Sequence, residues 1–132
     1  MFLQSQSFFV IVKSWATSHN LLVKYPEFEN QKQALINGTE IIICTPGRLL
    51  AHLKFDYFDT NFINHLILDE ADRMLDMGFY DDIIKIVNKL PKKRQTLLFS
   101  ATMPKAIRKL AKNILSIPNL SGETFLLEVI EN

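Results

Sequence analysis

The sequence predicts an α/β fold, in which helices flank a parallel sheet. Three short apolar runs are the first indication, because apolar residues without polar alternation are typical of strands buried on both faces. Amphipathic helical patterns between and after the runs are the second, since alternating strands and helices are the pattern of this fold class. A turn or cap signal directly after each run is the third, and it marks where each strand ends.

The three predicted strands end at polar or turn-forming residues. Because ligands of open parallel sheets bind at the carboxyl ends of the strands, we expect one edge of this sheet to carry a site. The strands and the residues that follow them are Ile41–Cys44 with Thr45-Pro46-Gly47-Arg48, Leu66–Leu68 with Asp69-Glu70, and Thr96–Phe99 with Ser100-Ala101-Thr102.

Three helices are predicted from the spacing of apolar residues. The last is the clearest, because its apolar residues recur at the spacing of one helix face, and Pro104 stands at its start. Its cations repeat that spacing about 200° around the helix, so we expect them on the opposite face. The apolar sets are Leu49, Leu50 and Leu53; Ile83, Ile84, Val87 and Leu90; and Ile107, Leu110, Ala111, Ile114 and Leu115, opposite Lys105, Arg108, Lys109 and Lys112.

Length and composition set the class of protein. The chain has 132 residues, 48% of them hydrophobic, which indicates one globular domain at most and argues against a disordered chain. A net charge of +1 excludes a highly basic nucleic-acid coat. Cys44 is the only cysteine, so no internal disulfide forms, and we expect a cytoplasmic protein. No apolar run reaches the ~18 residues that span a bilayer, so we expect no membrane partner.

The near-zero net charge hides a segregation along the chain. Residues 56–82 hold eight acidic side chains and one basic one, Arg73, whereas residues 83–122 hold nine basic side chains and no acidic one. An acidic region and a separate basic region suit a protein that binds a cation at the first and a polyanion at the second. Solvated helix faces give the same pattern of charges.

The segment Leu68-Asp69-Glu70-Ala71-Asp72 follows the second predicted strand. An acidic residue at the end of an apolar strand can hold Mg²⁺, which prefers oxygen ligands, and a neighbouring carboxylate can orient a water for attack on a phosphate. These roles fall to Asp69 for the metal and to Glu70 for the water. The alternative makes Asp69 a helix cap and Glu70 a first-turn acid that interacts with the helix dipole.

Three motifs in a fixed order resemble those of the DEAD-box ATP-dependent RNA helicase family. The motifs are the signature Asp69-Glu70-Ala71-Asp72, the preceding RNA-contacting motif Thr45-Pro46-Gly47-Arg48-Leu49, and the following coupling motif Ser100-Ala101-Thr102. The resemblance implies part of the first RecA-like domain of such a helicase. We therefore divide the chain into an atypical N-terminal segment, 1–30, a partial helicase ATP-binding domain, 31–116, and an atypical C-terminal tail, 117–132.

The resemblance implies catalytic and coupling roles for the residues after the second and third strands. Asp69 would hold Mg²⁺ and Glu70 would activate the attacking water, so ATP and Mg²⁺ are the implied cofactors. Asp72 would bond to Ser100 or Thr102, and this contact would couple the nucleotide site to the separation of RNA strands.

RNA is the partner that the resemblance implies for the first motif. Thr45, Gly47 and Arg48 would contact an RNA phosphate. This role agrees with the physics of the segment, because the free N–H groups at the start of a helix favour a phosphate. In isolation the same residues describe a plain turn from a strand to a helix.

Two parts of such a helicase are missing from this sequence. None of its four glycines, Gly38, Gly47, Gly78 and Gly122, precedes a lysine, so the phosphate loop G-x-x-x-x-G-K-[ST] is absent. The second RecA-like domain, which would be a partner, is absent too. We expect a truncated helicase fragment that is inactive alone. The alternative is a non-enzymatic remnant or a small module that binds RNA or protein.

Strand pairing beyond the three predicted strands stays open. Phe8–Val12 and Phe125–Leu127 are strand-like, but nothing in the sequence fixes their partners. Without the strand of the phosphate loop, we expect the strands that end at Asp69 and Ser100 to be separated by a gap or to pair directly. Either arrangement exposes an edge, and we therefore expect self-association.

Overall fold

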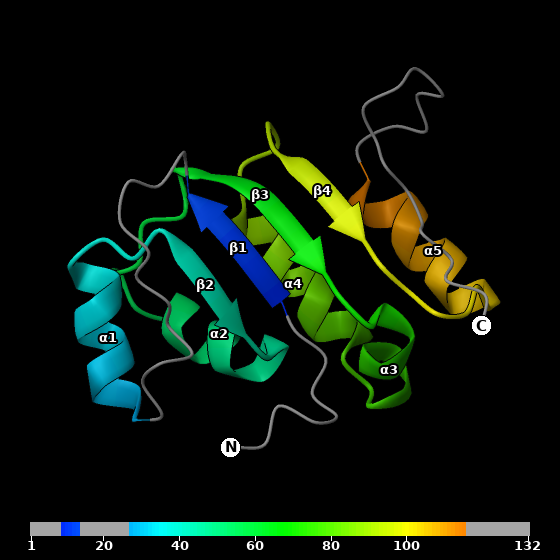
Figure 1. The fold of residues 1–132 in the computed structure, drawn as a ribbon, viewed down its shortest axis with the longest axis horizontal. Coiled ribbons are helices and arrows are strands. Elements are labelled where there is room, and N and C mark those ends of the chain that lie inside the picture. The colour runs from blue at the N-terminus through cyan, green and yellow to red at the C-terminus, as the bar shows by residue number, and fades with distance from the viewer. Residues whose placement is uncertain (1–8, 14–26, 116–132) are drawn as a thin grey trace.

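The computed structural model describes residues 9–13 and 27–115, and these residues form a sheet flanked by helices (Figure 1). Its strands and helices, in chain order, are β1 (Phe9–Lys13), α1 (Phe28–Ile36), β2 (Ile41–Cys44), α2 (Pro46–Leu53), β3 (Ile63–Leu68), α3 (Ala71–Asp76), α4 (Tyr80–Lys89), β4 (Gln95–Leu98) and α5 (Lys105–Ile114).

The sheet has the strand order β2-β1-β3-β4. β3 and β4 are parallel, whereas β1 is antiparallel to both of its neighbours, so β2, β3 and β4 all run in one direction. The predicted parallel α/β sheet is therefore confirmed for the three predicted strands. Phe9 pairs with Cys44 on one side and with Leu68 on the other, and Leu68 pairs with Leu98. The carboxyl ends of β2, β3 and β4 thus lie level at one edge.

β1 is the strand that the sequence could not place. The apolar run Phe8–Val12 does contain a strand, and the structure inserts it between β2 and β3. β3 and β4 pair directly, which is the second of the two arrangements expected for them. Among the described strands, β4 therefore has one neighbour and lies at an end of the sheet.

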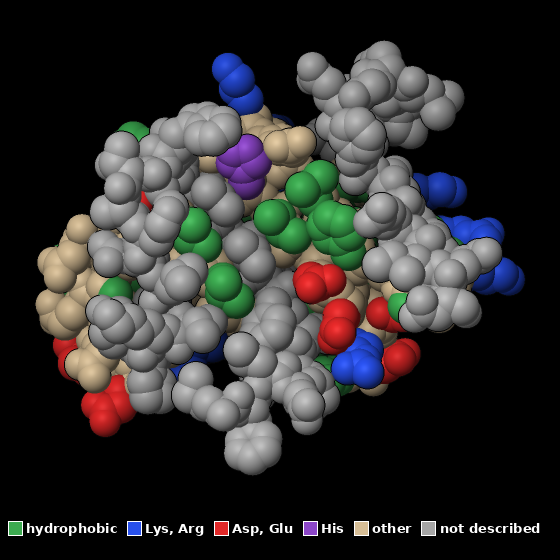
Figure 2. Space-filling view, viewed as in Figure 1, with side chains coloured by type: hydrophobic (Ala, Val, Ile, Leu, Met, Phe, Trp, Pro, Cys, Tyr) green, Lys and Arg blue, Asp and Glu red, His purple; other side chains and the backbone are tan. Residues whose placement is uncertain are grey.

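The two faces of the sheet differ in burial. Alternate residues of β2, β3 and β4, such as Ile42, Leu66 and Leu98, are fully buried, and α2 and α4 lie behind this face in Figure 1. The residues between them, such as Ile67 and Leu97, are only half-buried. Figure 2 looks onto this second face, where apolar side chains are visible over β3 and β4. Among the described residues, the second face is therefore less deeply buried than the first.

The three predicted helices are α2, α4 and α5. The apolar stripe of α5 is buried as predicted, and its four cations are exposed on the other side. Of the predicted set, Ile83, Val87 and Leu90 are likewise buried in or directly after α4, whereas Ile84 is only half-buried. Figure 2 shows the segregated charges on the surface, with acidic side chains beside α3 and basic ones over α5.

Helices α1 and α3 were not predicted, because α3 has only six residues and the apolar residues of α1 do not recur at the spacing of one helix face. Each ends in the same way, with a glycine of positive φ: Gly38 after α1 and Gly78 after α3. After α3, the Gly78 N–H donates to the Leu75 carbonyl and the Phe79 N–H donates to the Met74 carbonyl, both at 3.0 Å. This pair of bonds is the Schellman motif, and it satisfies carbonyls that a helix end leaves free.

The proposed division of the chain stays a prediction. α1 begins at Phe28, a few residues before the expected boundary at residue 31, and β1 comes from the segment ahead of that boundary. The strand-like Phe125–Leu127 lies outside the described residues. In the described part of the chain, no helix combines the length and the hydropathy that crossing a membrane requires.

Candidate active site at the carboxyl edge of the sheet

The residues that follow β3 and β4 line a common cavity of about 320 Å³. The expected meeting of these strand ends at one edge is present, because the two strands are parallel neighbours and end side by side. Two backbone bonds join the strand ends: the Phe99 N–H donates to the Leu68 carbonyl at 2.8 Å, and the Ala71 N–H donates to the Phe99 carbonyl at 2.9 Å. The cavity is lined by Asp69, Glu70, Asp72, Arg73, Phe99, Ser100 and Ala101.

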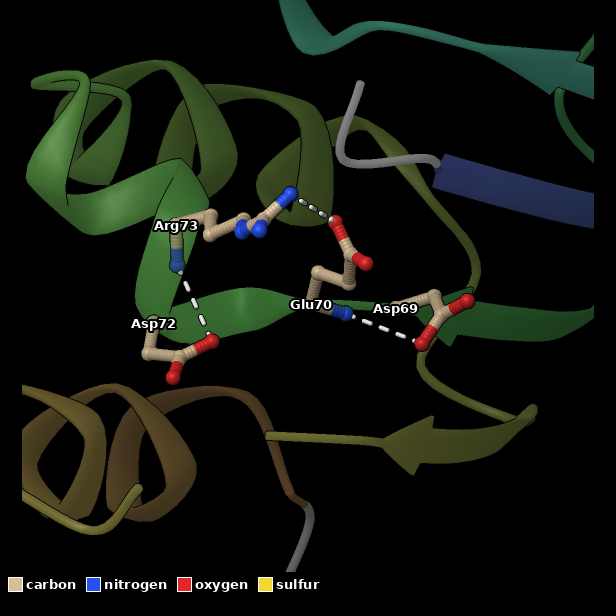
Figure 3. Close-up of polar contacts among 4 residues, drawn as sticks. All are labelled: Asp69, Glu70, Asp72 and Arg73. Atoms are coloured by element: carbon tan, nitrogen blue, oxygen red, sulfur yellow. Dashed lines mark hydrogen bonds and ion pairs between the residues drawn. The ribbon is translucent and has the colours of Figure 1, made fainter. Parts of the chain in front are cut away.

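Asp69 stands directly after β3, with an exposed side chain. Its Oδ1 accepts a hydrogen bond from the Glu70 backbone N–H at 2.9 Å, as Figure 3 shows. This bond fixes the orientation of the carboxylate. An exposed, oriented carboxylate that faces a cavity fits a hard cation such as Mg²⁺, which keeps several waters and takes one or two protein oxygens.

No larger cage of metal ligands accompanies Asp69. Within residues 9–13 and 27–115, no group of three or more His, Cys, Asp or Glu side chains is placed to hold an ion. A cation at Asp69 would therefore take most of its ligands from water and from a substrate. This is the way Mg²⁺ is held at phosphate-transferring sites.

Glu70 has a left-handed backbone conformation, with φ 53° and ψ 47°. It is the one non-glycine residue with positive φ in the described part of the chain. Such a conformation costs a residue with a Cβ about 1–2 kcal/mol, and strained residues of this kind cluster at functional sites. The Glu70 carboxylate lies 3.4 Å from the Arg73 guanidinium, from Oε2 to Nη1 (Figure 3).

The alternative in which Asp69 caps a helix does not hold. The residue directly before α3 is Glu70, and its side chain makes no capping bond. Asp69 instead bonds to the N–H of its own neighbour, ahead of the helix. The carboxylates of Asp69 and Glu70 therefore do not cap the backbone N–H groups at the start of α3.

Asp72 connects the end of β3 with the end of β4. Its Oδ2 accepts a hydrogen bond from the Thr102 hydroxyl at 3.0 Å, and its Oδ1 accepts one from the Arg73 backbone N–H, also at 3.0 Å. The buried Ser100 hydroxyl donates to the Thr102 carbonyl at 2.8 Å. Of the two contacts expected for Asp72, the one with Thr102 is thus present, and Ser100 contacts Thr102 rather than Asp72.

Thr45, Gly47 and Arg48 lie at the end of β2 and the start of α2, outside the residues that line the cavity. Gly47 and Arg48 are exposed, while Pro46 before them is buried. The Thr45 side chain makes no capping bond, so N–H groups at the start of α2 stay open to a ligand. The structure therefore keeps the predicted RNA-contacting residues apart from the acidic residues, on the same edge of the sheet.

Sequence reasoning missed the partner of Glu70. Arg73 follows Glu70 by three residues, the spacing at which side chains of one helix turn meet, so the pattern of charges held the signal. It also missed a buried network around His52, which is fully buried. His52 Nε2 lies 2.8 Å from Gln31 Oε1, and its Nδ1 lies 2.6 Å from the Tyr57 hydroxyl. No local spacing predicts this network, because Gln31 comes from another helix.

Burial shifts the acidity of one group in β2 and one in α2. It raises the pKa of the Cys44 thiol to about 12, so this thiol stays protonated and unreactive. Burial, and secondly the positive charge of Arg48, lowers the pKa of His52 below its usual value. The imidazole of His52 is therefore neutral at physiological pH.

Comparison with known proteins gives one consistent result. The model of the DEAD/DEAH box helicase family matches residues 3–110. The chain is 48% identical, over 91 residues, to the ATP-dependent RNA helicase DeaD of Buchnera aphidicola, and the match covers 69% of this chain and 15% of that protein. It is 49% identical, over 88 residues, to DEAD-box ATP-dependent RNA helicase 40 of Arabidopsis thaliana, and this match covers 67% of this chain and 8% of that protein.

Solved structures give the same answer for the fold. The crystal structure of a DEAD box protein from Methanococcus jannaschii superimposes with a TM-score of 0.68 at 38% sequence identity, over 75% of this chain and 28% of that one. A hypothetical ATP-dependent RNA helicase from Sulfolobus tokodaii superimposes with a TM-score of 0.62 at 37% identity, over 68% of this chain and 27% of that one. The chain thus spans less than a third of each of these relatives.

Proposed function

Because the chain belongs to the DEAD/DEAH box helicase family, we propose that it supplies part of the first RecA-like domain of an ATP-dependent RNA helicase. Such an enzyme would use ATP to remodel RNA duplexes or RNA–protein complexes. The observation that carries this proposal is the cavity at the ends of β3 and β4, where Asp69, Glu70 and Asp72 come together beside Thr102.

We assign Asp69 to Mg²⁺ and Glu70 to the attacking water. The oriented carboxylate of Asp69 fits the metal, which would supply charge stabilisation to a phosphate. A carboxylate beside it can orient or deprotonate water, and the Glu70 carboxylate lies with Arg73 at the cavity. The chain fits the triphosphate less well than it fits the metal, since no Gly-Lys pair is present to bind the phosphates.

We assign Asp72 and Thr102 to the coupling of the nucleotide site to RNA. Their hydrogen bond supports this role, because it joins the acidic motif after β3 to the segment between β4 and α5. A displacement of one of the two segments would then move the other. Ser100 supports Thr102 through the bond from its hydroxyl to the Thr102 carbonyl.

RNA is the proposed partner of Thr45, Gly47 and Arg48. Exposed backbone N–H groups at the start of a helix and a neighbouring guanidinium suit a phosphate. Further partners would be a second RecA-like domain and a second copy of this chain. A single cysteine, itself buried, suits a cytoplasmic location.

A chimeric helicase tests the enzymatic proposal. The chain is 46% identical over 91 residues to the ATP-dependent RNA helicase DeaD of Escherichia coli, so the aligned segment of that enzyme can be replaced by the segment from this chain. RNA-stimulated ATP hydrolysis is expected to persist in the chimera, and Glu70→Gln should lower it by about 100-fold or more. A chimera that folds and binds ATP without hydrolysing it would contradict the proposal.

A second candidate is a non-enzymatic module that binds RNA or protein. The observation that favours it is the absence of a Gly-Lys pair, because these 132 residues alone have no phosphate loop. The chimera separates the two candidates. Under this alternative, the segment from this chain would abolish hydrolysis, while RNA binding through Arg48 would remain.

A further inference from the structure

Four aromatic rings meet where α1 packs against α2, away from the acidic cavity. The Phe28 ring is parallel to the His52 ring, with centroids 4.1 Å apart, and the Phe55 ring is nearly parallel to the Tyr57 ring at 5.6 Å. The two pairs meet edge to face: Phe28 and Phe55 lie 6.3 Å apart, and His52 and Tyr57 lie 6.0 Å apart. We call these four residues the ring cluster.

The inner half of the ring cluster is held rigidly. His52 is fully buried, and its two ring nitrogens contact Gln31 and the Tyr57 hydroxyl. Gln31 is itself buried, so α1 is tied to α2 through a polar contact inside the fold. Phe28 lies against His52 and thereby takes a fixed place on the surface of α2. The position of Phe55 follows from its contacts with Phe28 and Tyr57.

The outer half of the ring cluster is open to solvent. Phe55 is 52% exposed, and among the large apolar side chains of the described residues only Met77 and Phe62 are more exposed. A half-exposed phenyl ring that is stacked on one side has apolar surface that water covers poorly. Its contacts with Phe28 and Tyr57 restrict the ring, which lowers the cost of ordering it when a planar ligand stacks on it.

Cations flank the ring cluster on both sides. The Arg48 guanidinium lies 5.8 Å from the Phe28 ring centroid, and the Lys32 ammonium lies 5.7 Å from the Tyr57 ring centroid. Lys32 also pairs with Glu29 at 3.7 Å, and this carboxylate offsets part of the attraction of Lys32 for a phosphate, so Arg48 is the better placed of the two cations. Rings between cations are the pattern of surfaces that bind single-stranded nucleic acid, with bases on the rings and phosphates on the cations.

We propose that the ring cluster is a stacking site for an unpaired RNA base, in which the base lies on Phe55 while Arg48 holds a phosphate of the same strand. This inference rests on the proposed RNA-binding function and adds a contact to a base. The site extends from the start of α2, where Arg48 lies, to the residues just after its end, where Phe55 lies. Because every base has a π-face, the contact is independent of sequence.

Binding of two fluorescent oligomers to the full chain tests this inference. One is an oligouridylate, and the other is an abasic oligomer of the same length, which keeps the phosphates and lacks the bases. Phe55→Ala is expected to weaken oligouridylate binding by about fivefold or more, and to leave binding of the abasic oligomer unchanged. Phe55→Trp, made together with Trp15→Phe so that it is the one tryptophan of the sequence, should keep the affinity, and its fluorescence should be quenched when unlabelled oligouridylate is added.

Two control variants separate this inference from the proposed function. Phe62→Ala removes another exposed phenylalanine, 67% exposed and outside the ring cluster, and should change neither affinity. Arg48→Ala should weaken both oligomers, since it removes a phosphate contact. If Phe55→Ala binds oligouridylate as the wild type does, or weakens both oligomers equally, the stacking site is disproved and RNA binding stands. If the wild-type chain binds neither oligomer, the proposed RNA-binding function fails as well.

Discussion

Glu70 has a backbone conformation that glycine adopts without strain, and this makes a prediction about its substitution. Glu70→Gly and Glu70→Ala both remove the ion pair with Arg73, so they differ mainly in backbone strain. Since a Cβ in the left-handed region costs about 1–2 kcal/mol, the glycine variant should be the more stable by about 1 kcal/mol. Urea unfolding of the two variants measures the difference. A more stable alanine variant would show that residue 70 is not left-handed.

His52 predicts how stability depends on pH. Gln31 Oε1 can only accept a hydrogen bond, so His52 Nε2 carries the proton and Nδ1 accepts from the Tyr57 hydroxyl. Burial, and secondly Arg48, lowers the pKa of His52 in the folded state, while in the unfolded state it is about 6.5. Below that value the unfolded chain binds more protons, so the stability that this shift contributes is lost as the pH falls through about 6.5 toward the folded pKa.

Urea unfolding at about pH 7.5 and about pH 5.5 checks this prediction for His52. The wild-type chain should lose more stability between the two values than a His52→Gln variant, in which the group cannot titrate. His19 and His65 are present in both proteins and cancel in the comparison. Equal losses in the two proteins would contradict a lowered pKa of His52.

At the scale of elements, the exposed cations of α5 and the start of α2 predict the salt dependence of RNA binding. Each phosphate contact adds to the dependence of affinity on salt, so Arg48→Ala should reduce the salt slope by about 1. The exposed cations of α5 are the second set of expected RNA contacts. Replacing Lys105, Arg108 and Lys112 by glutamate should therefore reduce the affinity for RNA further. Lys109 is left in place because its ammonium lies 5.2 Å from the Tyr80 ring centroid. If neither change alters a binding titration, these cations form only a solvated surface.

The elements differ in how far the sequence predicts them. α5 was predictable because its apolar face repeats over ten residues, and β2 because its apolar run ends sharply at Thr45-Pro46. The partners of β1 were not, since pairing joins residues distant in sequence and an apolar run carries no information on its neighbours. α3 has six residues, too few for a period to be recognised.

The candidate site divides in the same way. The acidic residues after β3 and the Ser-Ala-Thr segment after β4 were predictable, because both follow apolar strands and such strand ends meet at one edge. The left-handed backbone of Glu70 was not predictable, since the fold imposes it against the preference of the residue. The ring cluster was equally hidden, because its rings come from α1, from α2 and from the loop after α2.

The whole molecule predicts an absence of ATP hydrolysis by these 132 residues alone. Glu70 can orient a water, but no Gly-Lys pair holds the triphosphate beside it. Phosphate release by the wild-type chain should therefore equal that of Glu70→Gln, with and without RNA. Turnover that RNA stimulates, and that this variant loses, would contradict the prediction.

The open end of the sheet predicts self-association. β4 has a single neighbour among the described strands, and a strand edge without a partner is a template for another chain. Sedimentation of the purified chain should therefore show a mass that rises with concentration. Leu97→Lys places a charge on this strand, at a half-buried position, and should shift the chain toward the monomer. A wild-type chain that stays monomeric at high concentration would overturn this expectation.

The place of β1 in the sheet has a consequence for how the chain is made. β1 leaves the ribosome before both of its neighbours, yet it becomes an inner strand whose partners are residues 41–44 and 63–68. Its backbone groups must therefore wait for both partners to be synthesised before the sheet can close. Long loops have to be closed before such pairings contribute stability, which slows folding. During this interval the nascent strand is unpaired, and a chaperone that binds extended apolar segments could bind it before β2 and β3 do.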